Sequence, residues 1–121
     1  MNTYRLYCEA IKSSSLTVDA VLRNIPCDRN AKLQSVVICS RGGITADNTN
    51  YSKFQVKNGS TVVVERSFQT DDLAATTNEV LLPVEDATVD STTELAINYD
   101  ATGNGLALDL DVVLVFELAR G

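Results

Sequence analysis

The side chains that could do acid–base chemistry in this chain are its 16 carboxylates, because its 121 residues include no histidine. Three sets of carboxylates lie close together in the sequence: Asp71-Asp72, Glu85-Asp86, and Asp109 with Asp111. Two carboxylates can serve as the acid and base of glycoside hydrolysis. Adjacent acids between strands are more often solvated turn residues, so we predict no catalytic residue and no enzyme activity.

Asp109 and Asp111 differ from the other acids because they lie two residues apart in an alternating segment. That spacing places both side chains on one face of a strand. We interpret the pair as a solvent-facing strand end. The alternative is a cation site or a contact with a basic surface of a partner.

The other residue types argue against the usual nucleophile and metal sites. Without histidine the chain has no Ser-His-Asp or Cys-His arrangement, and it lacks a ligand common in transition-metal sites. The three cysteines, Cys8, Cys27 and Cys39, form no C-x-x-C pair, which argues against a zinc site or a disulfide framework. We predict Cys8 and Cys39 to be buried apolar side chains in a reducing compartment, and no metal or cofactor.

The charge of the chain restricts its partners. A formal net charge of −6 and a sequence pI near 4.4 disfavour nucleic acid and anionic membranes, which would repel the protein. No segment reaches the roughly 18 consecutive apolar residues of a membrane-spanning helix, and the first residues do not resemble a signal peptide. We therefore expect the chain to be made and assembled in the cytoplasm.

The elements that position these side chains are β-strands, and the clearest is the segment 106–118. Apolar residues occupy every second position there, so one face of the strand points into a core. These residues are Leu106, Leu108, Leu110, Val112, Leu114, Phe116 and Leu118. The other face carries Val113 and Val115 after the two aspartates. Two apolar faces predict either coverage by a loop of the same chain or a self-association interface at Val113 and Val115.

Shorter strand-like segments precede this one at intervals of about 8–15 residues. We predict strands at 4–11, 33–40, 51–57, 60–68, 79–84 and 94–100; the segment 16–23 fits a strand or a helix and is assigned to a strand. The segment 33–40 is apolar on both faces, which predicts a central strand covered on both sides. Asn58-Gly59 predicts a hairpin with a type I′ turn, and Pro83 marks an edge strand.

About eight strands separated by turn residues are typical of a particular fold class. We predict a single all-β domain, residues 1–121, folded as an antiparallel β-sandwich of the jelly-roll type. The core of this sandwich must consist mainly of Val, Leu, Ile and Ala, because aromatic residues make up only 6% of the chain.

The turns and strands between residues 39 and 118 follow one another in a recognisable order. The order runs through Ala46-Asp47-Asn48-Thr49-Asn50-Tyr51, Phe54 and Val56, Asn58-Gly59, a Thr/Asp loop, a Leu/Pro strand and Gly103-Asn104-Gly105-Leu106. It resembles that of tailed-phage head decoration (cement) proteins and related virion jelly rolls. The resemblance implies a non-enzymatic bacteriophage virion protein, commonly a homotrimer, that binds and stabilises the major capsid lattice at the capsid surface.

Two alternatives stay open at this stage. The first 38 residues carry no part of the resemblance, so residues 1–11 are either a capsid-contacting arm or a strand exchanged with a neighbouring copy. A head-fibre, tail or receptor-binding module that recognises host carbohydrate is the alternative function. Such a site needs exposed aromatic side chains, and Tyr51 and Tyr99 are the candidates.

Overall fold

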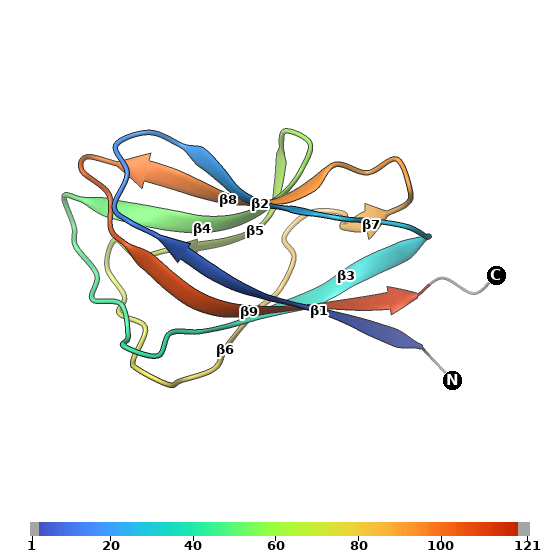
Figure 1. Ribbon diagram of the computed structural model, residues 1–121, viewed down its shortest axis with the longest axis horizontal. Helices are drawn as coiled ribbons and strands as arrows, with labels where there is room; N and C mark the ends of the chain where they lie inside the picture. Colours follow the sequence, from blue (N-terminus) through green and yellow to red (C-terminus); the bar gives the residue numbers. More distant parts are fainter. Residues whose placement is uncertain (1–2, 119–121) are drawn as a thin grey trace.

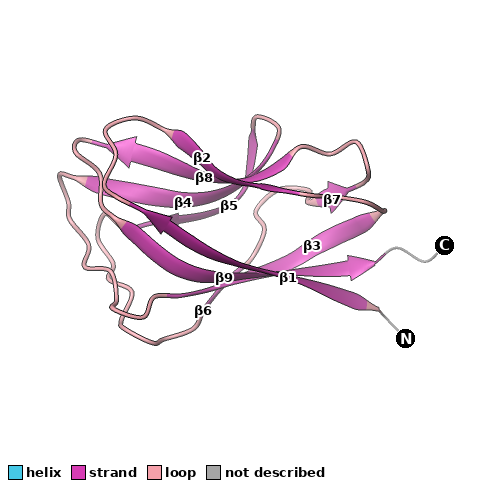
Figure 2. Ribbon diagram, in the orientation of Figure 1, coloured by secondary structure: helices cyan, strands magenta, loops and turns pink. Residues whose placement is uncertain are grey.

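The computed structural model describes residues 3–118, and their backbone runs through β-strands and turns (Figure 1, Figure 2). The strands are β1 (Tyr4–Ser13), β2 (Ala20–Ile25), β3 (Ala31–Cys39), β4 (Tyr51–Asn58), β5 (Thr61–Ser67), β6 (Glu79–Leu81), β7 (Thr88–Val89), β8 (Leu95–Thr102) and β9 (Leu108–Leu118). No helix that could cross a membrane occurs in these described residues.

Two antiparallel sheets stack face to face (Figure 1). Sheet A, the lower layer in that view, has the order β1-β9-β3-β6, and the short β7 also pairs with β3. Sheet B, the upper layer, has the order β2-β8-β4-β5. The chain passes repeatedly between the layers, and its first and last strands are neighbours in sheet A. This strand arrangement is that of a jelly roll, so the predicted antiparallel sandwich is confirmed.

The core fills the space between the two sheets, and it follows from the alternation of apolar residues. Leu108, Leu110, Val112, Leu114 and Phe116 of β9 are all buried on the inner face of sheet A. Leu106 precedes the strand instead of belonging to it. Sheet B contributes the buried residues Phe54, Val56, Val64, Leu95, Ile97 and Tyr99. Burial on this scale supplies the main favourable contribution to folding.

Most strand boundaries differ from the predictions by a few residues, and the strand predicted at 79–84 ends at Leu81; two further differences have a structural cause. The ambiguous segment 16–23 is a strand only from Ala20, because Leu16 belongs to a loop held by the Tyr99 hydroxyl. The segment 85–93, which lies between the strands predicted at 79–84 and 94–100, contains β7, whose Val89 is buried against the core. A two-residue strand in a polar segment leaves no periodic pattern, so alternation could not reveal it.

The predicted hairpin between β4 and β5 is confirmed, but its turn differs. Asn58 pairs with Thr61, so the two loop residues are Gly59 and Ser60. Gly59 has φ +59°, whereas no positive φ occurs at Asn58 or Ser60. A type I′ turn needs a positive φ at both central residues, while glycine at the first central position is typical of type II′. The type I′ prediction is therefore wrong.

Strand β3 is central in sheet A, as predicted, because it pairs with β9 on one side and with β6 and β7 on the other. Its inner residues Leu33, Val36 and Ile38 are buried. Its outer residues Val37 and Cys39 are only half-buried, so the predicted coverage of both faces is partial. Strand β6 lies at the sheet edge, as Pro83 indicates.

Candidate interaction surface

The structure does not bring the predicted carboxylates together into a reactive site. Asp71, Asp72, Glu85 and Asp86 are exposed loop residues. The Asp72 carboxylate accepts a hydrogen bond from the Ala46 amide at 2.7 Å, and that of Asp86 accepts one from the Thr88 hydroxyl at 2.8 Å. Both carboxylates therefore stabilise loops. Within residues 3–118, no three Cys, Asp or Glu side chains cluster closely enough to hold a metal ion.

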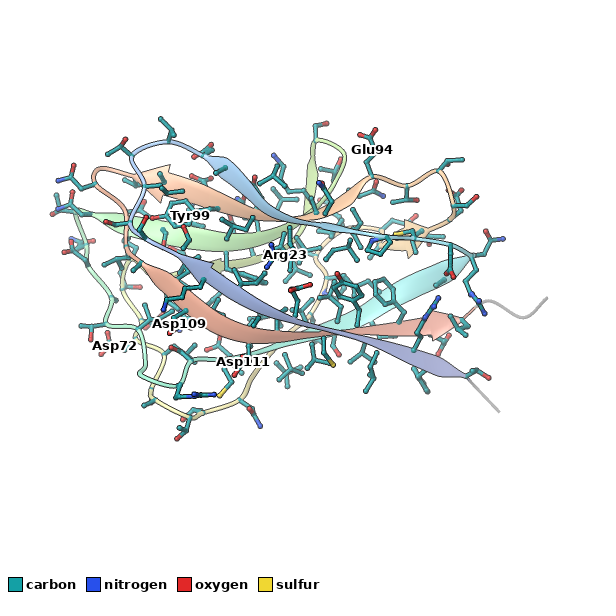
Figure 3. The ribbon with its side chains drawn as sticks, in the orientation of Figure 1. Arg23, Asp72, Glu94, Tyr99, Asp109 and Asp111 are labelled. Atoms are coloured by element: carbon teal, nitrogen blue, oxygen red, sulfur yellow. The ribbon has the colours of Figure 1, made fainter. Side chains whose placement is uncertain are left out.

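Asp109 and Asp111 do share one face, as the spacing predicts, and both are exposed on the outer side of sheet A (Figure 3). Lys12 of β1 is opposite Asp109 in the strand register. Lys12 and Arg41 line a shallow hollow together with the two aspartates. The acids are therefore set among basic side chains of their own chain.

The outer face of sheet A is apolar in the middle. One row across the sheet consists of Cys8, Val113, Val37 and Val80, which are paired in register on β1, β9, β3 and β6. The next row pairs Leu6 with Val115 and Val115 with Ser35. Leu6 and Val80 are 62% and 60% exposed, and the two valines of β9 are half-buried between them.

We name the apolar residues of this face the sheet A patch; its members are Leu6, Cys8, Val37, Val80, Val113 and Val115. Leu82 and Val84 follow β6 and are also strongly exposed, but the Val84 amide donates to the Val63 carbonyl of sheet B, so these two residues are not counted in the patch. Single exposed apolar side chains are ordinary, but a continuous group of them marks an interaction surface. The strongly exposed neighbours of Val113 and Val115 show that no described loop covers the patch.

Charged rows border the sheet A patch at both ends of the strands. Lys12, Arg41, Asp109 and Asp111 lie at one end. Tyr4, Glu117 and Lys32 form the row at the other end. An apolar centre with a polar rim is the usual anatomy of a protein–protein interface.

The outer face of sheet B has the opposite character. Its central row contains Gln55, which is 5% exposed, and Asn98, which is 7% exposed. The Asn98 amide donates to Gln55 Oε1 at 3.1 Å, and Gln55 Nε2 donates to Glu65 Oε1 at 2.8 Å. These two amides are already shielded from solvent and hydrogen-bonded, so the centre of this face offers little apolar area to bury against a partner.

Asp100 borders this polar row and accepts a longer hydrogen bond from Gln55 Nε2, at 3.3 Å. Burial raises the pKa of the Asp100 carboxyl above its ordinary value, and the nearby Asp19 carboxylate raises it further. Lys53 opposes this effect and also pairs with Glu65, with 3.8 Å between Nζ and Oε1. The polar row is therefore an internally satisfied network of amides and charges.

A cleft of about 260 Å³ opens between the sheets at the end where the described chain begins and stops. Its walls are mainly apolar and include Tyr7, Val89 and Phe116. Asp28 at its rim pairs with two guanidinium groups, those of Arg5 and Arg29. One carboxylate thus engages both guanidinium groups, and the three side chains together carry a formal charge of +1 at the rim.

The cysteines do not all lie where the sequence predicts. Cys8 is exposed within the sheet A patch, so the prediction of a buried Cys8 is wrong. Cys39 is half-buried, next to Asp111 in the register, and it is therefore not a core residue. Cys27 lines the cleft, and burial raises the pKa of its thiol, with further contributions from Asp28 and Asp90. All three thiols are free.

The two tyrosines proposed for carbohydrate recognition are not a pair of exposed rings. Tyr99 is fully buried between the sheets (Figure 3), and its hydroxyl donates to the Leu106 carbonyl at 2.7 Å. Tyr51 is half-buried at the start of β4. Tyr99 is therefore a structural residue, and the carbohydrate alternative loses one of its two candidates.

The residues that sequence analysis missed are those beside Val113 and Val115. Leu6 and Cys8 belong to a predicted strand, but they are part of its more apolar set, which apolar content would assign to the core, whereas the set that pairs with the inner face of β9 includes Arg5 and Glu9. Alternation shows that two faces exist and does not tell which one points outward. Only pairing with β9, whose inner face is unmistakable, places Leu6 and Cys8 outside.

Comparisons with known proteins identify no relative by sequence. No family model matches the chain, and no curated protein matches it. Among solved structures, the chain is similar to one of the Gx strain of infectious bursal disease virus, with 12% identity, a TM-score of 0.45, and 99% of this chain covered. A subviral particle of that virus's VP2 gives 13% identity, a TM-score of 0.45 and 95% coverage.

The chain spans about a third of the length of these two viral chains, 33% and 32% respectively. At these TM-scores the likeness is too distant to carry an argument about function. The fold assignment accordingly rests on the strand order itself.

Proposed function

We propose that this protein is a non-enzymatic structural protein of a virion, a capsid decoration protein that attaches to the major capsid lattice and associates with copies of itself. The observation that carries the proposal is the contrast between the two outer faces of the sandwich. Sheet A presents an apolar patch with a charged rim, whereas sheet B presents a satisfied polar network. We expect such a protein to act through the surface area that it buries against its partners.

The turn order that resembles decoration proteins supports the same function. The hairpin at Gly59 and the turn at Gly103 and Gly105 connect strands of the jelly roll, and residues 46–50 form an irregular connection that leads into β4. The resemblance implies trimers on the capsid surface, assembled in the host cytoplasm. Repetition over a lattice strengthens attachment, because many weak contacts act together.

Quantitative mass spectrometry of purified particles from the source organism tests this proposal. The copy number of this chain is compared with that of the major capsid protein in the same particles. A ratio near one to one, or a simple fraction of it, supports a decoration protein. A few copies per particle would instead indicate a fibre or tail component, and absence from the particles would overturn a virion role.

Attachment is tested separately with particles stripped of this chain. Purified protein is added back, and the bound amount is measured by sedimentation with the particles. Saturable binding in a fixed ratio to the major capsid protein is the expected result. Binding that does not saturate, or none at all, would contradict a lattice-binding function even if the chain is found in virions.

A further inference from the structure

We infer that the sheet A patch, as defined above, is the surface through which this chain binds a second copy of itself. The inference rests on the proposed function. It names the surface through which copies associate, a second copy as the molecule bound, and the burial of apolar area as the driving force. Val113 and Val115 lie at the centre of the patch, and exposed Leu6, Cys8 and Val80 widen it on both sides.

The size of this face corresponds to a small contact. Strand β9 has 11 residues, which at about 3.4 Å per residue makes the face roughly 35 Å long. Three long strands and the short β6, at about 4.8 Å spacing, make it roughly 14–19 Å wide. Because β6 has only three residues, the flat area of the whole face, its charged ends included, is roughly 500–550 Å², which is below the ~800 Å² that each partner buries in a standard interface.

The charge of the face favours a second copy over a strongly charged partner. Three basic residues, Lys12, Lys32 and Arg41, and three acidic residues, Asp109, Asp111 and Glu117, border the patch. These six side chains sum to zero formal charge, whereas the whole chain carries −6; Glu85 and Asp86, which share a hollow with Lys32, add negative charge beside this border. Two copies that meet through this face bring together their least repulsive surfaces, with both signs of charge available at each end of the rim.

The driving force has a consequence for salt dependence. Two chains of charge −6 repel each other at a distance, while the patch that they bury is apolar. Added salt screens the repulsion and leaves apolar burial favourable. Self-association is therefore expected to strengthen as the sodium chloride concentration rises, whereas a contact built on ion pairs would weaken.

The test measures the mass of the purified protein by light scattering and sedimentation, against 13.1 kDa for one chain. Leu6→Asp and Val80→Asp place a charge in the patch. Both side chains are exposed in the single chain, so we expect both variants to fold. Both variants are expected to shift the mass to that of a single chain. Val115→Asp is expected to do the same, with its thermal unfolding measured because Val115 is half-buried.

Val21→Asp is the matched control. Val21 is 59% exposed and faces outward on β2 of sheet B, paired with Asn98. The substitution adds the same charge to the same residue type on the opposite face, so the oligomer mass should equal that of the unchanged protein. An equal loss of assembly in this variant would show that net charge, not the patch, controls association, and would overturn the inference.

Cys8 offers a second readout because its thiol is exposed within the patch. Maleimide labelling at Cys8, followed by peptide mass spectrometry, is expected to be slow in the assembled protein and fast in Leu6→Asp. Equal labelling rates would overturn the assignment of the surface. A single-chain mass for the unchanged protein would also overturn it; if that protein still bound particles, the decoration function would stand without self-association.

Discussion

The backbone at Gly105 lies directly against the hydroxyl of Tyr99. A Cβ atom at position 105 would come within 2.3 Å of the Tyr99 hydroxyl oxygen and within 2.3 Å of the Leu16 carbonyl oxygen. The same hydroxyl donates to the Leu106 carbonyl and accepts from the Leu16 and Leu106 amides, each at 3.1 Å. One buried side chain therefore fixes the two loops that adjoin β2 and β9.

Tyr99→Phe tests this arrangement. The substitution keeps the ring in the core but leaves the Leu16 and Leu106 amides and the Leu106 carbonyl without their partner. A fully buried polar group left unpaired costs about 1–3 kcal/mol. Leu16 and Leu106 are only half-buried, so water replaces part of the lost hydrogen bonding, and we expect the free energy of unfolding to fall by about 2–4 kcal/mol, measured by urea denaturation. Tyr51→Phe is the control, because the Tyr51 hydroxyl makes no hydrogen bond within residues 3–118, and a change within about 0.5 kcal/mol is expected. Equal losses in the two variants would contradict the proposed role.

The dependence of the loops on Tyr99 also shows where the sequence stops being informative. The alternation of Leu95, Ile97 and Tyr99 places the three side chains on one face of β8, and all three are buried, so the expectation of an exposed Tyr99 is wrong. The partners of its hydroxyl are 83 and 7 residues away, and no local pattern encodes contacts at such separations. For the same reason, alternation finds Val113 and Val115 but cannot name Leu6 or Val80 as their neighbours.

Arg66 organises the loop between β5 and β6. Its Nε atom lies 2.6 Å from Glu79 Oε2, its guanidinium donates to the carbonyls of Asp71 and Asp72, and its plane lies over the Phe68 ring at 4.5 Å. Lysine cannot reproduce this forked geometry. Because hydrogen bonds to charged groups contribute about 1.5–3 kcal/mol, we expect Arg66→Lys to lower the free energy of unfolding by about 2 kcal/mol.

The control for Arg66 is Arg29→Lys. Arg29 pairs with Asp28 at the surface, where both side chains are 56% exposed. Exposed ion pairs contribute about 0–1 kcal/mol, so this variant should unfold almost as the unchanged protein does. Faster proteolysis of the loop 67–78 in Arg66→Lys, and not in Arg29→Lys, would tie the lost stability to that loop. An unchanged free energy of unfolding in Arg66→Lys would show that the loop keeps its structure without the forked hydrogen bonds of the guanidinium.

The carboxyl groups of Asp47 and Asp100 make the free energy of unfolding depend on pH, with opposite signs. Hydrogen bonds from the Asn50 and Thr49 amides lower the pKa of the Asp47 carboxyl. The contribution of Asp47 to folding stability is therefore present above its ordinary pKa and is lost as the pH falls through the lowered pKa. The pKa of Asp100 is raised, so its ionised form disfavours the folded state and stability is gained as pH falls through the raised pKa.

Asn substitutions at these positions separate the two effects. Asp47→Asn should be less stable than the unchanged protein at neutral pH, and the difference should disappear below the lowered pKa of Asp47. Asp100→Asn should be at least as stable at neutral pH, with its advantage shrinking as the medium becomes acidic. Thermal unfolding between neutral pH and pH 3 measures both differences; curves that run parallel over this range would contradict both assignments.

Three glycine-to-alanine variants distinguish backbone strain from steric conflict. Gly42 has no positive φ and nothing within 4 Å of an added Cβ, so Gly42→Ala should leave stability unchanged or raise it by about 0.4–1 kcal/mol. Gly59 has φ +59° with open space around it, so Gly59→Ala should cost only the left-handed backbone penalty, about 1–2 kcal/mol. Gly105 has φ +68° and the close contacts with Tyr99 and Leu16, so Gly105→Ala must cost more than Gly59→Ala.

The comparison of Gly105→Ala with Tyr99→Phe then isolates the contact between the two residues. Removing the hydroxyl relieves the conflict with an added Cβ at position 105, although the conflict with the Leu16 carbonyl stays. The double variant should therefore lose less free energy of unfolding than the sum of the single losses, because the two changes share one contact. Strict additivity in urea denaturation would show that the Tyr99 hydroxyl does not constrain position 105.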